Sequence, residues 1–184
     1  DRENMVAKAI SHLERALERE ADYYRLYHAL GNTHMKAQQV MKAIKCFQKA
    51  ADLNGNVPEV HFAMAQACEA IFRPDFAIQE YERAIAIEPR YSDALYHLGM
   101  IRLQLGEVDK AIPHYYSSIE LNPKDAFAHY NLALSYVRTN KVEQALPHFN
   151  KAIELAPREG HFHCELASAL RSVKRLADAM REFE

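Results

Sequence analysis

The sequence contains few of the residues that mark several large classes of protein. Only five Gly and seven Pro occur among 184 residues, which suits helices better than a turn-rich β protein. Three Cys are too few for a disulfide framework, and no Cys/His pair has zinc-type spacing. No run approaches the ~18 consecutive apolar residues of a membrane-spanning helix, so we expect no direct membrane insertion.

Neither sign of charge dominates the chain. Lys and Arg number 23 and Asp and Glu number 25, which leaves no basic field for nucleic acid. With 49% apolar and 26% charged residues, the composition is that of a folded globular domain. The first residue is Asp1 and not Met, so the sequence leaves the compartment open, and we expect the cytoplasm.

An internal repeat of 34 residues organises the chain. Its clearest column consists of Ala9, Ala43, Ala77, Ala111, Ala145 and Ala179. Four residues after each Ala stands a bulky apolar residue: Leu13, Phe47, Tyr81, Tyr115, Phe149 and Phe183. A second small column holds Gly31, Ala65, Gly99, Ala133 and Ala167. Small residues allow two helices to approach closely, and the aromatic column fills the adjoining space.

Each repeat is interpreted as two helices. In one unit, apolar spacing predicts a first helix near 93–105, which ends at Gly106 because glycine adopts positive φ without strain. A second helix is predicted near 109–122 and ends before Pro123, which cannot continue the backbone ladder. Since one helix pair cannot bury both of its faces, neighbouring pairs are expected to stack.

These residues resemble the tetratricopeptide repeat family, whose pattern places an aromatic, Leu-Gly or Leu-Ala, Tyr, Ala, Phe or Tyr, Ala and Pro in that order. The resemblance implies an all-α fold, a right-handed α-solenoid of stacked antiparallel helix pairs. It implies one solenoid over 1–184, with complete repeats at 24–57, 58–91, 92–125 and 126–159 and partial repeats at 1–23 and 160–184. Both ends look unfinished, so we expect a longer parent chain or a contact between chains.

The ten His residues do not indicate a metal or catalytic site. His61, His129 and His163 occupy the column in which the family places an aromatic residue, so packing explains them. His114 and His148 share a column 34 residues apart, and stacked helices ~8–10 Å apart are too far separated for both to bind one metal. No phosphate loop or nucleophile motif occurs. We therefore expect no catalytic residue, metal or cofactor, and no enzyme activity.

The resemblance also implies that the first helices line the concave face of the solenoid. The candidate partner-binding residues on that face are His28, Asn32, Phe62, Gln66, Tyr96, Met100, Leu103, Tyr130, Leu134 and Val137. They form an apolar and aromatic strip with polar ends, which suits an extended or helical peptide. The alternative is that these side chains pack against the neighbouring first helix.

The leading hypothesis is a protein–protein interaction scaffold that binds a partner segment in this groove and self-associates through the groove or the chain ends. The alternative is the substrate- or partner-selecting repeat region of a larger enzyme, such as a glycosyltransferase. In one such family a ladder of Asn lines the groove, whereas here Asn32 and Asn131 occupy different columns. Relatives that clamp an acidic chaperone tail use Lys, Arg and Asn, to which Phe62 and Tyr96 do not correspond.

Overall fold

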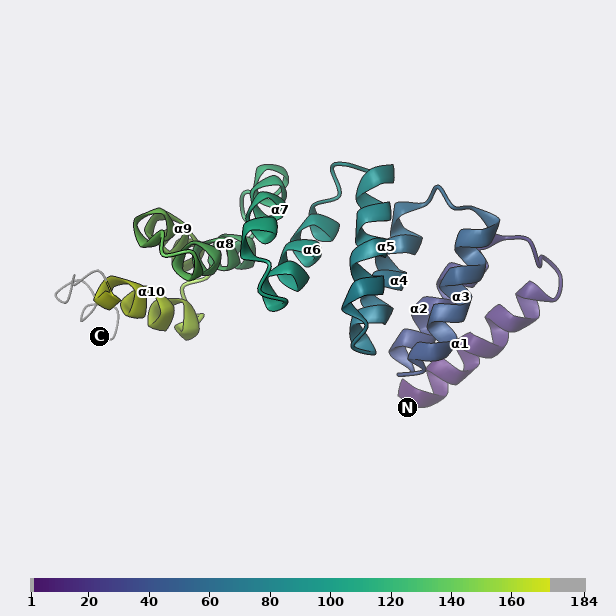
Figure 1. Cartoon of the computed structure of the whole chain (residues 1–184). Helices are drawn as coiled ribbons and strands as arrows, with labels where there is room; N and C mark the ends of the chain where they lie inside the picture. Colours follow the sequence, from purple (N-terminus) through teal and green to yellow (C-terminus); the bar gives the residue numbers. More distant parts are fainter. Residues whose placement is uncertain (1, 173–184) are drawn as a thin grey trace. The chain divides into compact units, whose positions relative to one another are not determined.

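The computed structural model describes residues 2–172, which form ten α-helices and no strand (Figure 1). The helices are α1 (Arg2–Leu17), α2 (Tyr24–Lys36), α3 (Val40–Leu53), α4 (Pro58–Ala70), α5 (Pro74–Ile87), α6 (Ser92–Gln104), α7 (Val108–Leu121), α8 (Ala126–Arg138), α9 (Val142–Leu155) and α10 (Gly160–Ser172). The all-α prediction is confirmed, and the helices expected near 93–105 and 109–122 each begin one residue earlier. The repeat residues Ala179 and Phe183 lie outside the described residues.

The chain divides into two compact units, residues 1–89 and residues 90–184. In unit 1, α2 pairs with α3 and α4 with α5, while α1 packs on α2 and α3 on α4. In unit 2, α6 pairs with α7 and α8 with α9, while α7 packs on α8 and α9 on α10. The grouping of all repeats into one solenoid over 1–184 stays a prediction.

The turn inside each complete helix pair has the same backbone conformation. Its second residue has a positive φ in every case: Gln38 (58°), Phe72 (56°), Gly106 (78°) and Asn140 (58°). The N–H that follows closes the turn on the first helix, as when Glu107 N donates to Arg102 O at 2.8 Å. The predicted end of α6 before Gly106 is confirmed. Phe72 adopts the same conformation, although a left-handed residue other than glycine costs about 1–2 kcal/mol.

Small residues permit close packing within the helix pairs, as the repeat predicts. A Cβ added to Gly99 would lie 2.9 Å from Cε1 of Tyr115, and one added to Gly31 would overlap the ring of Phe47. The aromatic rings that face this column are fully buried; they are Phe47, Tyr81, Tyr115 and Phe149. Each pair therefore holds its first helix directly against an aromatic ring of its second helix. This contact fixes which face of the first helix remains outside the pair.

Candidate partner-binding surfaces

The ten predicted partner-binding residues all lie on first helices, in both units. Unit 1 carries His28 and Asn32 on α2 and Phe62 and Gln66 on α4. Unit 2 carries Tyr96, Met100 and Leu103 on α6 and Tyr130, Leu134 and Val137 on α8. Asn32 is exposed, Leu103 is buried, and the other eight are half-buried. The predicted strip is therefore neither a fully exposed surface nor a fully packed interior.

One column of this strip packs on the aromatic residue of its own second helix. The ring centroids are 5.9 Å apart for His28–Phe47, 5.6 Å for Phe62–Tyr81, 6.1 Å for Tyr96–Tyr115 and 6.0 Å for Tyr130–Phe149. Tyr130 also stacks on Phe162 of α10, a neighbouring first helix, at 4.5 Å. The alternative of packing against a neighbouring first helix therefore accounts for only part of the contacts. Each of these rings is therefore held in a fixed orientation by the aromatic residue of its own second helix.

In unit 2 the strip is continuous with the hydrophobic core. Leu103 is only 6% exposed and belongs to that core, and Tyr96, Tyr130, Leu134 and Val137 pack against it. Asn131 Nδ2 donates to the Tyr96 hydroxyl at 3.1 Å. Burial raises the pKa of Tyr96, with a smaller contribution from the nearby negative charge of Asp125, so the phenol stays protonated at neutral pH. The half-buried members of the strip are thus anchored apolar and aromatic groups.

In unit 1 the strip is more polar. Asn32 Nδ2 lies 3.2 Å from His28 Nε2. Because the amide nitrogen can only donate, His28 Nε2 accepts, and the proton of the neutral ring resides on Nδ1. Burial lowers the pKa of His28, and the charge of Glu59 opposes that effect. At neutral pH this end of unit 1 therefore presents a neutral imidazole and an amide.

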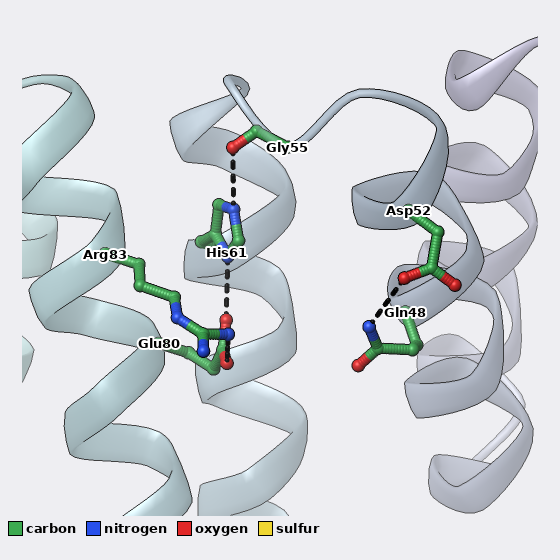
Figure 2. Close-up of polar contacts among 6 residues, drawn as sticks. All are labelled: Gln48, Asp52, Gly55, His61, Glu80 and Arg83. Carbon is green, nitrogen blue, oxygen red and sulfur yellow. Dashed lines mark hydrogen bonds and ion pairs between the residues drawn. The ribbon is translucent and has the colours of Figure 1, made fainter.

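The buried His61 forms an ion pair in unit 1 (Figure 2). Its Nδ1 lies 2.7 Å from Oε2 of Glu80, and its Nε2 lies 3.1 Å from the carbonyl oxygen of Gly55. Both partners accept, so both ring nitrogens donate and His61 is an imidazolium beside the Glu80 carboxylate. The other oxygen of Glu80 accepts from Arg83 Nη1 at 2.6 Å. The hydrogen bond to Glu80 raises the pKa of His61 more strongly than burial lowers it.

The equivalent histidine two repeats later has a different partner. His129 Nε2 lies 3.2 Å from the carbonyl oxygen of Pro123, and its Nδ1 lies 3.2 Å from Nδ1 of His148. The carbonyl can only accept, so His129 donates from Nε2, and when both rings are neutral its Nδ1 accepts from the Nδ1–H of His148. Burial lowers the pKa of His148, and the neighbouring His129 adds to that effect.

His61 and His129 occupy a repeat column that predicts packing, and their partners Glu80 and His148 were not predicted. The available signal was spacing, because Glu80 and His148 each follow their histidine by 19 residues. Among the described residues, no group of three or more His, Cys, Asp or Glu side chains is arranged to bind a metal ion. These histidines join the two helices of a pair.

A cleft in unit 1 lies away from the predicted strip. It is lined by Val6, Ala7 and Ile10 of α1 and by residues 36–39 at the end of α2 and in the following turn. No sequence motif indicated this cleft. Among residues 2–172, none of the helices combines the length and the apolar character needed to cross a membrane.

Comparison with solved structures places the chain among helical repeat proteins. A crystal structure of MamA is 27% identical, covers 86% of this chain and 86% of its own, and has a TM-score of 0.77. MamA from Desulfovibrio magneticus RS-1 is 22% identical and has a TM-score of 0.82, with 87% of this chain and 90% of that chain covered. YrrB, described as a TPR protein with an unusual peptide-binding site, is 23% identical and has a TM-score of 0.74, with 93% and 84% covered.

Family models identify the repeat directly. Two models, both described as tetratricopeptide repeat, match residues 2–67 and 90–158, which together make up well over half of the chain. A search of curated protein sequences found no match. With ten helices, the 34-residue spacing and both models in agreement, the chain belongs to the tetratricopeptide repeat family.

Proposed function

We propose that the chain is a non-enzymatic protein–protein interaction scaffold that binds a peptide or helix of a partner on the inner face of its first helices. An interaction role is what the tetratricopeptide repeat family and its structural neighbours support. One observation carries the finer proposal: Tyr96, Tyr130, Leu134 and Val137 of unit 2 remain half-buried although they adjoin a well-packed core.

The strip has the composition of a peptide-binding surface. Anchored aromatic and methionine side chains supply most of the binding energy in such sites, because burying them removes a large apolar area from water. In unit 2 this role falls to Tyr96, Met100, Tyr130, Leu134 and Val137, with Leu103 as the buried floor. In unit 1 the corresponding groups are Phe62 and Gln66, followed by the polar His28 and Asn32.

The first test uses peptides selected from a random library against the full chain. The double variant Tyr96→Ala with Leu134→Ala should lose binding of the selected peptides while its far-UV circular dichroism stays close to that of the wild type. Met41→Ala is the matched control, because Met41 is 61% exposed and lies on α3, outside the strip. Unchanged peptide affinity in a folded double variant would exclude the strip as the binding site.

Thermal unfolding of the double variant separates binding from packing. Tyr96 packs on Tyr115, and Leu134 packs against the core of unit 2, so truncation costs some stability. A variant that unfolds would show that these side chains are required for the fold. In that case Met100→Lys, a change at a half-buried position, tests the same surface without opening a cavity in the core.

Self-association is the second part of the proposal. Unit 1 exposes Phe72 and Phe76, which are 90% and 52% exposed, at its α4–α5 turn and the start of α5. Exposed aromatic residues favour contacts between copies. Light scattering over a wide range of concentrations should give a mass that rises above the 21.1 kDa of one chain. A constant mass of one chain would exclude self-association, and the peptide-binding proposal would be unaffected.

A further inference from the structure

Tyr81 and Tyr115 occupy equivalent positions in two helix pairs, but only one of their hydroxyl groups has a partner. The Tyr81 hydroxyl donates to Oε2 of Glu69 on α4 at 2.6 Å. Tyr115 is fully buried, and no described residue offers its hydroxyl a hydrogen bond. A buried donor without an acceptor is unfavourable and uncommon in folded proteins. The Tyr115 hydroxyl therefore marks a place where an acceptor is missing.

Comparison of equivalent positions in the two units identifies the missing acceptor. In unit 1 the acceptor at this position is the carboxylate of Glu69. The Phe62–Tyr81 and Tyr96–Tyr115 ring pairs have centroid distances of 5.6 and 6.1 Å and interplanar angles of 58° and 57°, so the two tyrosines are held alike. The residue of α6 that corresponds to Glu69 is Leu103, whose side chain cannot accept a hydrogen bond. Unit 2 thus retains the donor while lacking the carboxylate that satisfies it in unit 1.

A positive charge lies beside Leu103, the residue of unit 2 that corresponds to Glu69. Arg138 Nη1, from α8, donates to the carbonyl oxygen of Leu103 at 3.1 Å. Arg138 is exposed and forms no ion pair with any carboxylate of residues 2–172. Burial is the main cause of the raised pKa of Tyr115, and the charge of Arg138 acts against it, as expected for a nearby cation.

The neighbouring polar groups add a third donor, the Tyr96 hydroxyl. The Tyr96 hydroxyl accepts from Asn131 Nδ2, so its own proton remains to be donated. The Asp125 carboxylate lies close enough to raise the pKa of Tyr96, and its Oδ1 accepts from the backbone N–H groups of Phe127 and Ala128, which directs it to the start of α8. The Tyr115 and Tyr96 hydroxyl groups and the Arg138 guanidinium therefore provide hydrogen-bond donors and one positive charge beside the half-buried apolar side chains of the strip.

We propose that unit 2 binds a partner segment in which an Asp or Glu is flanked by apolar residues, and that Arg138 and the Tyr115 hydroxyl hold its carboxylate. This inference rests on the proposed function and names the chemistry of the partner. The carboxylate takes the role that Glu69 plays for Tyr81 in unit 1, and Met100, Leu134 and Val137 contact the flanking apolar side chains. Arg138 makes the first contact because it is exposed, and Tyr115 joins after side chains of the strip move aside.

The test measures the affinities of library-selected peptides for the full chain and its variants by fluorescence anisotropy. We expect the selected sequences to be enriched in one acidic residue between apolar ones. Tyr115→Phe and Arg138→Gln should each weaken binding by about tenfold or more, the effect of a lost hydrogen bond to a charged group. Replacing the acidic residue of the peptide by its amide should remove most of the sensitivity to Arg138→Gln.

Matched controls exist within the chain. Tyr81→Phe removes a hydroxyl from the same column in unit 1, and Arg158→Gln removes another exposed arginine; neither should change the affinity. Tyr115→Phe should fold, because Phe47 and Phe149 occupy the equivalent positions of α3 and α9. Circular dichroism of each variant verifies this point.

The outcomes distinguish this inference from the proposed function. Peptides that lose binding with Tyr96→Ala and Leu134→Ala, yet lack an acidic residue or bind Tyr115→Phe and Arg138→Gln normally, would overturn the carboxylate site and leave the peptide-binding strip intact. A library that yields no binding sequence would count against both. Enrichment of acidic sequences that depend on Arg138 but not on Tyr115 would refute the role of the hydroxyl.

Discussion

Single residues at equivalent positions of the repeat differ in how their polar atoms are satisfied, and stability should report the difference. Tyr81→Phe removes the hydroxyl that donates to Glu69 and should lower the free energy of unfolding by about 1–2 kcal/mol. Tyr115→Phe removes a hydroxyl with no partner and should leave stability unchanged or slightly higher. Urea unfolding of both variants measures these two changes in stability. Equal losses of unfolding free energy in the two variants would contradict the conclusion that only the Tyr81 hydroxyl has a partner.

His61 should make stability depend on pH in a defined direction. Its pKa is raised in the folded state, so its contribution is fully present below the ordinary value of 6.5 and is lost as the pH rises through the raised value. The groups that face it are Glu80 and Arg83 of α5 and the Gly55 carbonyl. Wild type and His61→Gln should therefore differ most in thermal midpoint at mildly acidic pH, and less as the pH rises. A difference that stays constant with pH would exclude a charged His61.

At the scale of the helix pair, close approach depends on the absence of a single Cβ. Gly99→Ala places a methyl group against the ring of Tyr115 and should lower stability by about 1–3 kcal/mol. Gly160→Ala is the control, because a Cβ there would meet nothing within 4 Å. Thermal unfolding of the two variants measures the effect. The prediction fails if Gly99→Ala is as stable as Gly160→Ala.

The helix pairs also show what a sequence of this kind can predict. Helix limits followed from Gly106, Pro123 and the apolar periodicity, because those residues act on the backbone locally. The left-handed turns at Gln38 and Phe72 did not, because neither residue favours positive φ and the turn is imposed by the two helices it joins. The burial of Leu103 was also missed, since a column shared across repeats does not fix how deeply each member packs.

The candidate site was predictable only in part for the same reason. The repeat placed all ten proposed partner-binding residues on first helices, where the structure has them. Two features of the site were not predictable. The hydroxyl of Tyr115 has no partner, and Arg138 contacts Leu103, which lies on a different helix. Such contacts depend on packing between helices, which residue spacing does not specify.

At the scale of the whole molecule, His61 of unit 1 and His148 of unit 2 should contribute to the pH dependence of stability in opposite directions, and the lowered pKa of His28 partly offsets the contribution of His61 within unit 1. The imidazolium of His61 stabilises unit 1 at low pH. In unit 2 the lowered pKa of His148 means that protonation favours the unfolded state, so stability is lost as the pH falls below the ordinary value of 6.5. Histidine NMR signals followed with temperature at two pH values can monitor each unit in the intact chain. We expect unit 2 to unfold at a lower temperature under mildly acidic conditions than at neutral pH.

Glu80 and His148 occupy equivalent positions of the repeat, so one substitution should give unit 2 the pH dependence that His61 and Glu80 give unit 1. His148→Glu places a carboxylate 19 residues after a buried histidine, as in unit 1, and should convert the histidine pair into an ion pair. The pH dependence of unit 2 should then reverse, which the same NMR measurement detects, and an unreversed dependence would show that the two positions are not equivalent. In a repeat protein of this kind, the pH dependence of stability can thus be changed one repeat at a time, by introducing into one repeat an ion pair found in another.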